Sequence, residues 1–203
     1  MPRPPEPRRF SVGLFCGSRL GADPTHAAAA EQLGREIGRR GWRLVYGGGE
    51  VGLMGTTARS AMAAGAEVLG IIPQRLLDRE VGKRDISELR VTATMFDRKE
   101  QLIQASDAFA VLPGGLGTLD EILDAVTLRQ LGYHAKPILL VDLGGYWQAS
   151  RAVFERFVAA GFADASATRL YELVPDIASA LLRLEDAAGA LLRLEDAAGE
   201  RGR

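Results

Sequence analysis

The sequence contains very little cysteine, lysine or histidine and has no long run of apolar residues. Cys16 is the only cysteine, so the chain can form no internal disulfide and no zinc site built from thiolates. No apolar stretch reaches the roughly 18 residues that a transmembrane helix requires. The two histidines, His26 and His134, form no pattern typical of metal ligands or of a catalytic triad. Disulfide scaffolds, thiolate zinc proteins and membrane-spanning proteins are therefore excluded.

The chain also has almost no net charge, because 25 basic residues nearly balance 26 acidic ones and leave a formal charge of −1. No overall field attracts nucleic acid or anionic lipid, so neither is expected as a partner. A chain of 203 residues with 47% hydrophobic content is typical of one globular domain. The N-terminal segment MPRPPEPRRF lacks the apolar stretch of a secretory signal, which predicts a cytoplasmic protein.

Apolar runs and helical patterns alternate along the chain. The predicted strands are residues 11–16, 43–47, 67–72, 89–94, 107–113 and 137–142. The predicted helices are residues 25–40, 55–64, 95–106 and 119–132. This alternation predicts an α/β fold: a Rossmann-like, doubly wound parallel sheet with helices on both faces, in a single domain. Ligands of such sheets bind at the carboxyl ends of the strands.

Three regions are expected along the chain. Residues 1–9 hold four prolines and three arginines and are predicted to form a disordered tail. Residues 10–179 are predicted to form the Rossmann-like domain. Residues 180–203 are a helical segment and tail in which ALLRLEDAAG occurs twice in succession. Ten residues turn a helix by roughly −80° beyond whole turns, so the second copy cannot continue the apolar stripe of the first.

Glycine is abundant, with 24 residues, and the strongest motif is the glycine-rich segment at residues 112–121. Gly114, Gly115 and Gly117 allow the backbone to approach a ligand closely, and Thr118 offers a hydroxyl donor. The free N–H groups at the start of the following helix suit a phosphate. The spacing matches neither the NTPase phosphate loop nor the dinucleotide fingerprint. A capping box formed by Thr118 and Glu121 is the alternative interpretation.

Two further glycine-rich turns follow predicted strands, at residues 16–21 and 47–55. Ser18 lies in the first of these turns, and Gly48 and Met54 lie in the second. Each turn alone is compatible with a tight connection from strand to helix. Three such turns at one edge of a sheet predict a pocket of the size of a nucleotide.

Arg98 and Lys99 begin the helix that precedes the strand leading to residues 112–121. Arg98 is suited to bidentate contact with a carboxylate or a phosphate, whereas a solvated surface pair is the alternative for both residues. Met95 and Phe96 fit either the core or the apolar wall of a base pocket. Cys16, at the end of a buried strand, is expected to be a core thiol.

These segments resemble the Lonely Guy family. The sequence PGGLGTLDE matches its PGGxGTxxE motif, and GGGEVGLMG, the CGS turn and the Arg-Lys pair stand where that family has them, over residues 10–175. The resemblance implies a cytokinin riboside 5′-monophosphate phosphoribohydrolase, which cleaves N6-modified AMP into a free base and ribose 5-phosphate. It also implies a homodimer on a Rossmann-like fold that needs no metal and no organic cofactor.

The resemblance assigns Arg98 and Glu121 as the catalytic pair. The substrate contacts that it implies are Ser18, Gly48, Met54, Glu80, Arg98, Lys99, Gly114, Gly115, Leu116, Gly117, Thr118, Leu119, Asp120, Glu121 and Thr127. Thr127 lies roughly 120° around the helix from Glu121, which favours a role in the other subunit's site. The sequence departs from the family at two places. Phe96-Asp97 stands where the family frequently has His-Glu, and Arg19 stands where the family's CGSS turn has its second serine.

Two other functions compete with this prediction. The family is often labelled lysine decarboxylase, a reaction that ordinarily needs a lysine holding pyridoxal phosphate. Only Lys99 lies near the motifs, and no pyridoxal pattern surrounds it. The second alternative is a non-catalytic carrier of a nucleotide or of the molybdenum cofactor on the same fold. A carrier needs the phosphate cradle but not the pair of Arg98 and Glu121, so the presence of both favours the enzyme.

Overall fold

The computed structural model describes residues 8–78 and 85–201. Its strands are β1 (Ser11–Phe15), β2 (Arg43–Tyr46), β3 (Glu67–Pro73), β4 (Glu88–Thr92), β5 (Ala108–Val111), β6 (Ile138–Val141) and β7 (Glu172–Val174). Its α-helices are α1 (Pro24–Arg39), α2 (Gly52–Ala63), α3 (Gln74–Leu77), α4 (Met95–Ala105), α5 (Leu116–Gln130), α6 (Gln148–Ala159) and α7 (Ile177–Arg201). Two short 3-10 helices, η1 (Leu143–Gly145) and η2 (Ala165–Arg169), complete the elements. In the described ranges, no helix is both long enough and apolar enough to cross a membrane.

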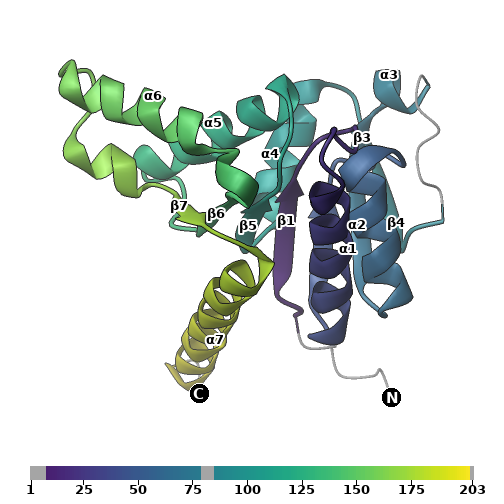
Figure 1. The fold of residues 1–203 in the computed structure, drawn as a ribbon. Helices are drawn as coiled ribbons and strands as arrows, with labels where there is room; N and C mark the ends of the chain where they lie inside the picture. Colours follow the sequence, from purple (N-terminus) through teal and green to yellow (C-terminus); the bar gives the residue numbers. More distant parts are fainter. Residues whose placement is uncertain (1–7, 79–84, 202–203) are drawn as a thin grey trace.

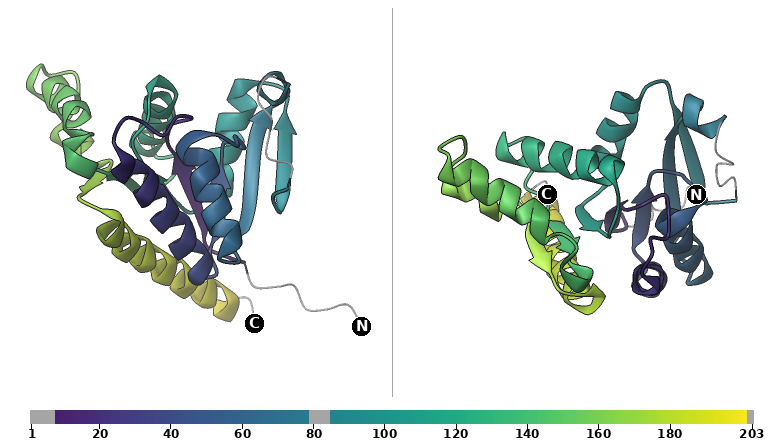
Figure 2. Two further views of the ribbon diagram at one scale, coloured as in Figure 1. Left: turned by 45° about the vertical axis from the view of Figure 1, so that its right-hand side comes forward. Right: turned by 45° about the horizontal axis from the view of Figure 1, so that its top comes forward.

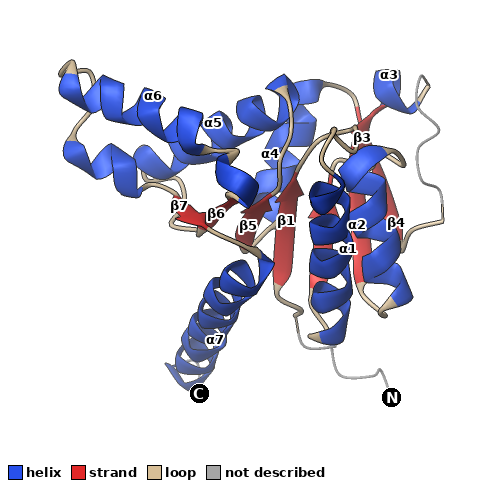
Figure 3. Cartoon of the chain, viewed as in Figure 1, coloured by secondary structure: helices blue, strands red, loops and turns tan. Residues whose placement is uncertain are grey.

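The described strands form one parallel sheet in the order β4-β3-β2-β1-β5-β6-β7 (Figures 1 and 3). Neighbouring strands pair in parallel throughout, and β1 pairs with both β2 and β5. The chain builds outward from β1 to β4 and then returns to add β5 beside β1. The topological switch point therefore lies between β1 and β5, where ligands of such sheets bind. The predicted α/β fold is confirmed.

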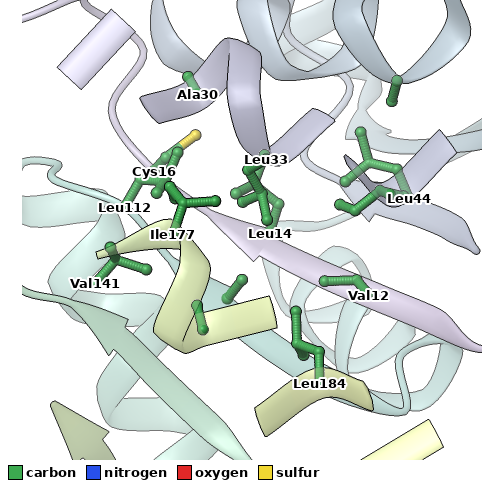
Figure 4. Packing of buried hydrophobic residues seen from close by; sticks show 14 of the residues in the cluster. Val12, Leu14, Cys16, Ala30, Leu33, Leu44, Leu112, Val141, Ile177 and Leu184 are labelled. Carbon is green, nitrogen blue, oxygen red and sulfur yellow. The ribbon is translucent and has the colours of Figure 1, made fainter. Parts of the chain in front are cut away.

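Side chains of successive strand residues enter two separate cores, because they alternate between the faces of the sheet. Val12 and Leu14 of β1 pack with Leu33 of α1 and Leu184 of α7 (Figure 4). Phe15 belongs to the other core, with Leu102 of α4, Ile122 of α5 and Phe154 of α6. Helices α1, α2 and α7 thus cover one face, and α4, α5 and α6 cover the other (Figure 2). This confirms the prediction of helices on both faces.

Both copies of ALLRLEDAAG lie in the single helix α7, and only the first packs closely on the core. Leu184 is fully buried, whereas its counterpart Leu194 is 67% exposed. Likewise Leu181 is 5% exposed, and its counterpart Leu191 is only partly buried. This is the loss of the apolar stripe that the ten-residue period predicts. In the second copy, Glu195 forms an exposed ion pair with Arg8, which precedes β1.

The two copies should therefore differ in their contribution to stability. We expect Leu184→Ala to lower the free energy of unfolding by about 2–5 kcal/mol, the usual cost of a cavity in a core. Leu194→Ala should change it by less than about 0.5 kcal/mol, because the side chain is exposed. Urea unfolding followed by circular dichroism measures both values. Equal costs for the two substitutions would contradict the packing described for α7.

Candidate active site

The three glycine-rich turns interlock at the carboxyl ends of β1, β2 and β5. The N–H of Gly17 donates to the carbonyl oxygen of Pro113 at 3.0 Å, and the N–H of Leu53 donates to the carbonyl oxygen of Gly17 at 3.1 Å. A Cβ added at Gly52 would lie 2.4 Å from the backbone nitrogen of Arg19, so a side chain there would force the first two turns apart. As predicted, the three turns line a common cleft.

The cleft has a volume of about 950 Å³, enough for a nucleotide. The residues of the predicted site that line it are Ser18, Met54, Arg98, Gly114, Gly115, Leu116, Gly117, Thr118, Asp120 and Glu121. Gly48, Lys99, Leu119 and Thr127 do not line it. Glu80 lies outside the described residues.

The first turn of α5 forms one end of the cleft. Gly115 is the N-cap residue and no side chain caps the helix, so the capping box of Thr118 and Glu121 is wrong. Thr118 lies within the first turn and is 3% exposed. A Cβ at Gly114 would lie 2.0 Å from Thr118 Oγ1, so the turn can pass close to this hydroxyl only with glycine. The N–H groups of the first turn have no partner within the helix and can bind an anion.

Arg98 and Glu121 form a buried ion pair deep in the cleft. Arg98 Nη2 lies 3.2 Å from Glu121 Oε1, and the two side chains are 11% and 12% exposed. Arg98 Nε also donates to the carbonyl oxygen of Ile71 at 3.1 Å, which fixes the guanidinium against β3. A capping box between Thr94 and Asp97 fixes the start of α4, which carries Arg98. The site therefore holds a rigid cation beside a buried carboxylate.

Burial raises the pKa of Glu121 to about 7, although the positive charge of Arg98 acts in the opposite direction. A carboxyl group with this pKa exchanges a proton readily at neutral pH. This is the property required of a general base or general acid. Perturbed carboxyl groups in a cleft are typical of functional sites.

Lys99 connects α4 to α5 rather than facing the cleft. Its Nζ lies 2.6 Å from Asp120 Oδ2 and 2.7 Å from Asp124 Oδ2. Its side chain is 16% exposed, so the interpretation of Arg98 and Lys99 as a solvated surface pair is wrong. The Lys99 amine does not line the cleft and is paired with two carboxylates, so it is poorly placed for a Schiff base. Within the described residues, no group of three or more His, Cys, Asp and Glu side chains is arranged to hold a metal.

The other end of the cleft is apolar. Met54, Ile72, Leu76 and Met95 line it, which places Met95 in the wall of the cleft rather than in the core. Phe96 is 82% exposed and does not line the cleft. A planar base with an apolar substituent would fit against these side chains.

Tyr146 lines the cleft and was not predicted. Its hydroxyl donates to the carbonyl oxygen of Gly114 at 2.5 Å, and its ring contacts the edge of His26 with centroids 5.8 Å apart. Gly144 and Gly145, both with positive φ, turn the chain after β6 and present Tyr146 to the cleft. The detectable signal was the segment DLGGYW, which follows a predicted strand and so lies at the same edge of the sheet.

We expect Tyr146→Phe to raise the KM for a phosphorylated substrate about fivefold to tenfold, because the Gly114 carbonyl loses its donor and the turn loosens. The free energy of unfolding should fall by no more than about 1.5 kcal/mol. Steady-state kinetics and urea unfolding measure the two effects. Tyr133→Phe is the control, because Tyr133 is 76% exposed and does not line the cleft. An unchanged KM in Tyr146→Phe would show that this hydrogen bond does not position the turn.

Comparison with known proteins identifies the family. Residues 54–184 match the sequence model of a family described as "possible lysine decarboxylase". The chain is 40% identical over 175 residues to the cytokinin riboside 5′-monophosphate phosphoribohydrolase LOG7 of Arabidopsis thaliana, covering 86% of this chain and 81% of that protein. The chain belongs to the Lonely Guy family. A second Lonely Guy protein, the probable phosphoribohydrolase LOGL1 of Oryza sativa subsp. japonica, is 39% identical and covers 89% of this chain and 81% of its own length.

Solved structures share the fold of this Lonely Guy chain at much lower identity. The Moco carrier protein of Chlamydomonas reinhardtii superposes with a TM-score of 0.69 at 20% identity, covering 90% of this chain and 99% of that one. The molybdenum cofactor binding protein of Rippkaea orientalis superposes with a TM-score of 0.68 at 23% identity, covering 88% and 97%. These likenesses establish the fold and not the activity.

Proposed function

We propose that this chain hydrolyses the N-glycosidic bond of an adenosine 5′-monophosphate, preferably modified at N6, to give the free base and ribose 5-phosphate. The buried pair of Arg98 and Glu121, beside the start of α5, carries this proposal. The names of the relatives, cytokinin riboside 5′-monophosphate phosphoribohydrolases, support it. The substrate is then a small molecule, a nucleoside monophosphate.

The two ends of the cleft suggest how the substrate lies. The phosphate would bind the N–H groups of the first turn of α5 and the hydroxyl of Thr118. The base would lie against the apolar wall that includes Ile72 and Met95. This orientation brings the glycosidic bond to the middle of the cleft, near Glu121 and Arg98.

Cleavage develops positive charge on the ribose, as in other glycoside hydrolysis. The bond between the base nitrogen and C1′ breaks, and its electron pair leaves with the base. A water oxygen then bonds to C1′, and the Glu121 carboxylate accepts a proton from this water. The departing base takes up a proton from solvent and Glu121 returns its proton to solvent, so the products are the neutral base and ribose 5-phosphate. The carboxylate also stabilises the positive charge of the sugar. Arg98 orients Glu121, and the bound phosphate fixes the sugar for attack.

The carboxylate role predicts the direction of the pH dependence. The active form of Glu121 is deprotonated, and its pKa is about 7, so kcat/KM should rise with pH and level off above about 7. Below that value it should fall about tenfold for each pH unit. A phosphate monoester itself titrates with a second pKa of about 6. The pH profile of the residual activity of Glu121→Gln shows the contribution of the phosphate titration alone. The same pH profile of kcat/KM in this variant and in the wild type would contradict the assignment of the pH dependence to Glu121.

The direct test is release of the base. Purified protein is incubated with isopentenyladenosine monophosphate and, separately, with AMP, and the free base is measured by chromatography. We expect release from at least one of them. No release from either, with nucleotide binding still measurable, would favour a carrier, the alternative suggested by the Moco carrier structures.

We also infer that the enzyme acts as a homodimer through the outward face of α4 and α5. Leu116, Leu123 and Thr127 lie on one exposed face of α5, and Leu116 and Phe96 are 87% and 82% exposed. Thr127 would then serve the site of the partner subunit. Sedimentation equilibrium should give about twice the chain mass of 21.8 kDa, and a monomer would contradict the inference. A cytoplasmic location fits the single free thiol, Cys16, and cell fractionation tests it.

A further inference from the structure

The charged side chains that line the cleft differ in whether they have partners. Each of the three carboxylates is engaged: Glu121 pairs with Arg98, Asp120 pairs with Lys99, and Asp23 accepts from the N–H and hydroxyl of Thr25. Arg19 also lines the cleft and is exposed. Within the described part of the chain, its guanidinium has no hydrogen bond and no ion pair. The cleft thus carries a positive charge that no other described side chain pairs with.

The backbone of Arg19 is held close to the glycine-rich turn before α5. A Cβ placed on Gly17 would lie 3.1 Å from the carbonyl oxygen of Arg19 and 3.4 Å from that of Pro113. The same position is 3.5 Å from the Cα of Gly114. The backbone of Arg19 therefore lies beside the glycine-rich turn that precedes α5, at the anion-binding end of the cleft. The backbone of Arg19 is held by its neighbours, whereas its long side chain has no partner among the described residues.

We propose that Arg19 binds the 5′-phosphate of the substrate and strengthens this enzyme's preference for nucleoside monophosphates over nucleosides. The inference rests on the proposed function and deepens it. A guanidinium can bind two phosphate oxygens at once, whereas the serine of the family's CGSS turn offers a single hydroxyl. The contact is electrostatic and is made equally to substrate and to ribose 5-phosphate. It therefore strengthens binding of both molecules and leaves the bond-breaking step unchanged.

The test compares Arg19→Ser and Arg19→Lys with a matched control, Arg35→Ser. Arg35 is an exposed arginine of α1 that does not line the cleft, so its replacement makes the same change in net charge. For Arg19→Ser, the KM for AMP and the inhibition constant of ribose 5-phosphate should each rise about tenfold, with kcat within about twofold. Hydrolysis of adenosine should not change. Arg19→Lys should recover part of the loss, and Arg35→Ser should behave as the wild type.

Binding measurements separate this inference from the proposed function. Calorimetric titration with ribose 5-phosphate needs no turnover, so it tests Arg19 even if no base is released. An unchanged dissociation constant in Arg19→Ser, or no binding to the wild type, would overturn the inference. An equal loss with adenosine and AMP would also overturn it, because a contact to phosphate cannot affect the nucleoside. Absence of base release alone would count against the proposed function only.

Discussion

Replacing Glu121 by glutamine is expected to lower kcat for base release by about 10³-fold or more, with KM changed only a few-fold. Glutamine has nearly the same shape but carries no negative charge and accepts no proton from water. The enzyme therefore loses both the stabilisation of the ribosyl cation and the general base. The loss of the carboxylate charge has a large effect because Glu121 is buried, where little water is present to stabilise the ribosyl cation instead.

Single-turnover assays of folded protein measure the loss directly. Glu31→Gln is a suitable control, because it removes an exposed carboxylate of α1 that does not line the cleft. Its activity should equal that of the wild type. Calorimetric titration with AMP should show that Glu121→Gln still binds nucleotide. Hydrolysis by folded Glu121→Gln at the wild-type rate would remove Glu121 from the mechanism.

Gly47→Ala should lower kcat by about 10²-fold although the substitution adds one methyl group and no charge. A Cβ at Gly47 would lie 2.1 Å from Arg98 Nη2, the atom that faces Glu121. Arg98 is also held by the carbonyl oxygen of Ile71, so its guanidinium must move away from Glu121 or lose that bond. A shift of about 1 Å in a catalytic group is enough for a loss of this size.

Gly13→Ala is the control that distinguishes a loss of activity in Gly47→Ala from a general loss of stability. A Cβ at Gly13 would lie 2.4 Å from Ser106 Oγ and 2.7 Å from a ring carbon of Phe109, in the core and outside the cleft. Gly13→Ala should therefore lower the free energy of unfolding by about 1–3 kcal/mol, as other overpacked cores do. Its activity per folded molecule should stay at the wild-type level. A similar loss of kcat in both variants would show that Gly47 acts only through stability.

Much of the fold could be predicted because its signals are local. The buried strands are unbroken apolar runs, and glycines mark the turns that follow them. Strand β7 has three residues and α6 buries only Phe154, so neither has a pattern strong enough to detect. Tyr146 was missed for a related reason, since it reaches the cleft from the loop before α6.

The catalytic pair could be proposed from the motif, but the surroundings of each residue could not. The pattern places Arg98 and Lys99 side by side in sequence, yet one enters the cleft and the other pairs with Asp120 and Asp124 of α5. That difference depends on how α4 packs against α5, which sequence spacing does not reveal. The raised pKa of Glu121 has the same origin, because burial is a property of the fold.

The repeated segment in α7 determines how further copies of it would pack. A third copy of ALLRLEDAAG would turn its leucines a further 80° or so around the axis, away from the sheet. Such an addition would leave the core untouched and add nothing to it. A repeat of eleven residues would return almost to the same face and would need a longer sheet to pack against. We therefore expect a further ten-residue copy to leave the core packing unchanged, because ten residues are out of phase with the helix.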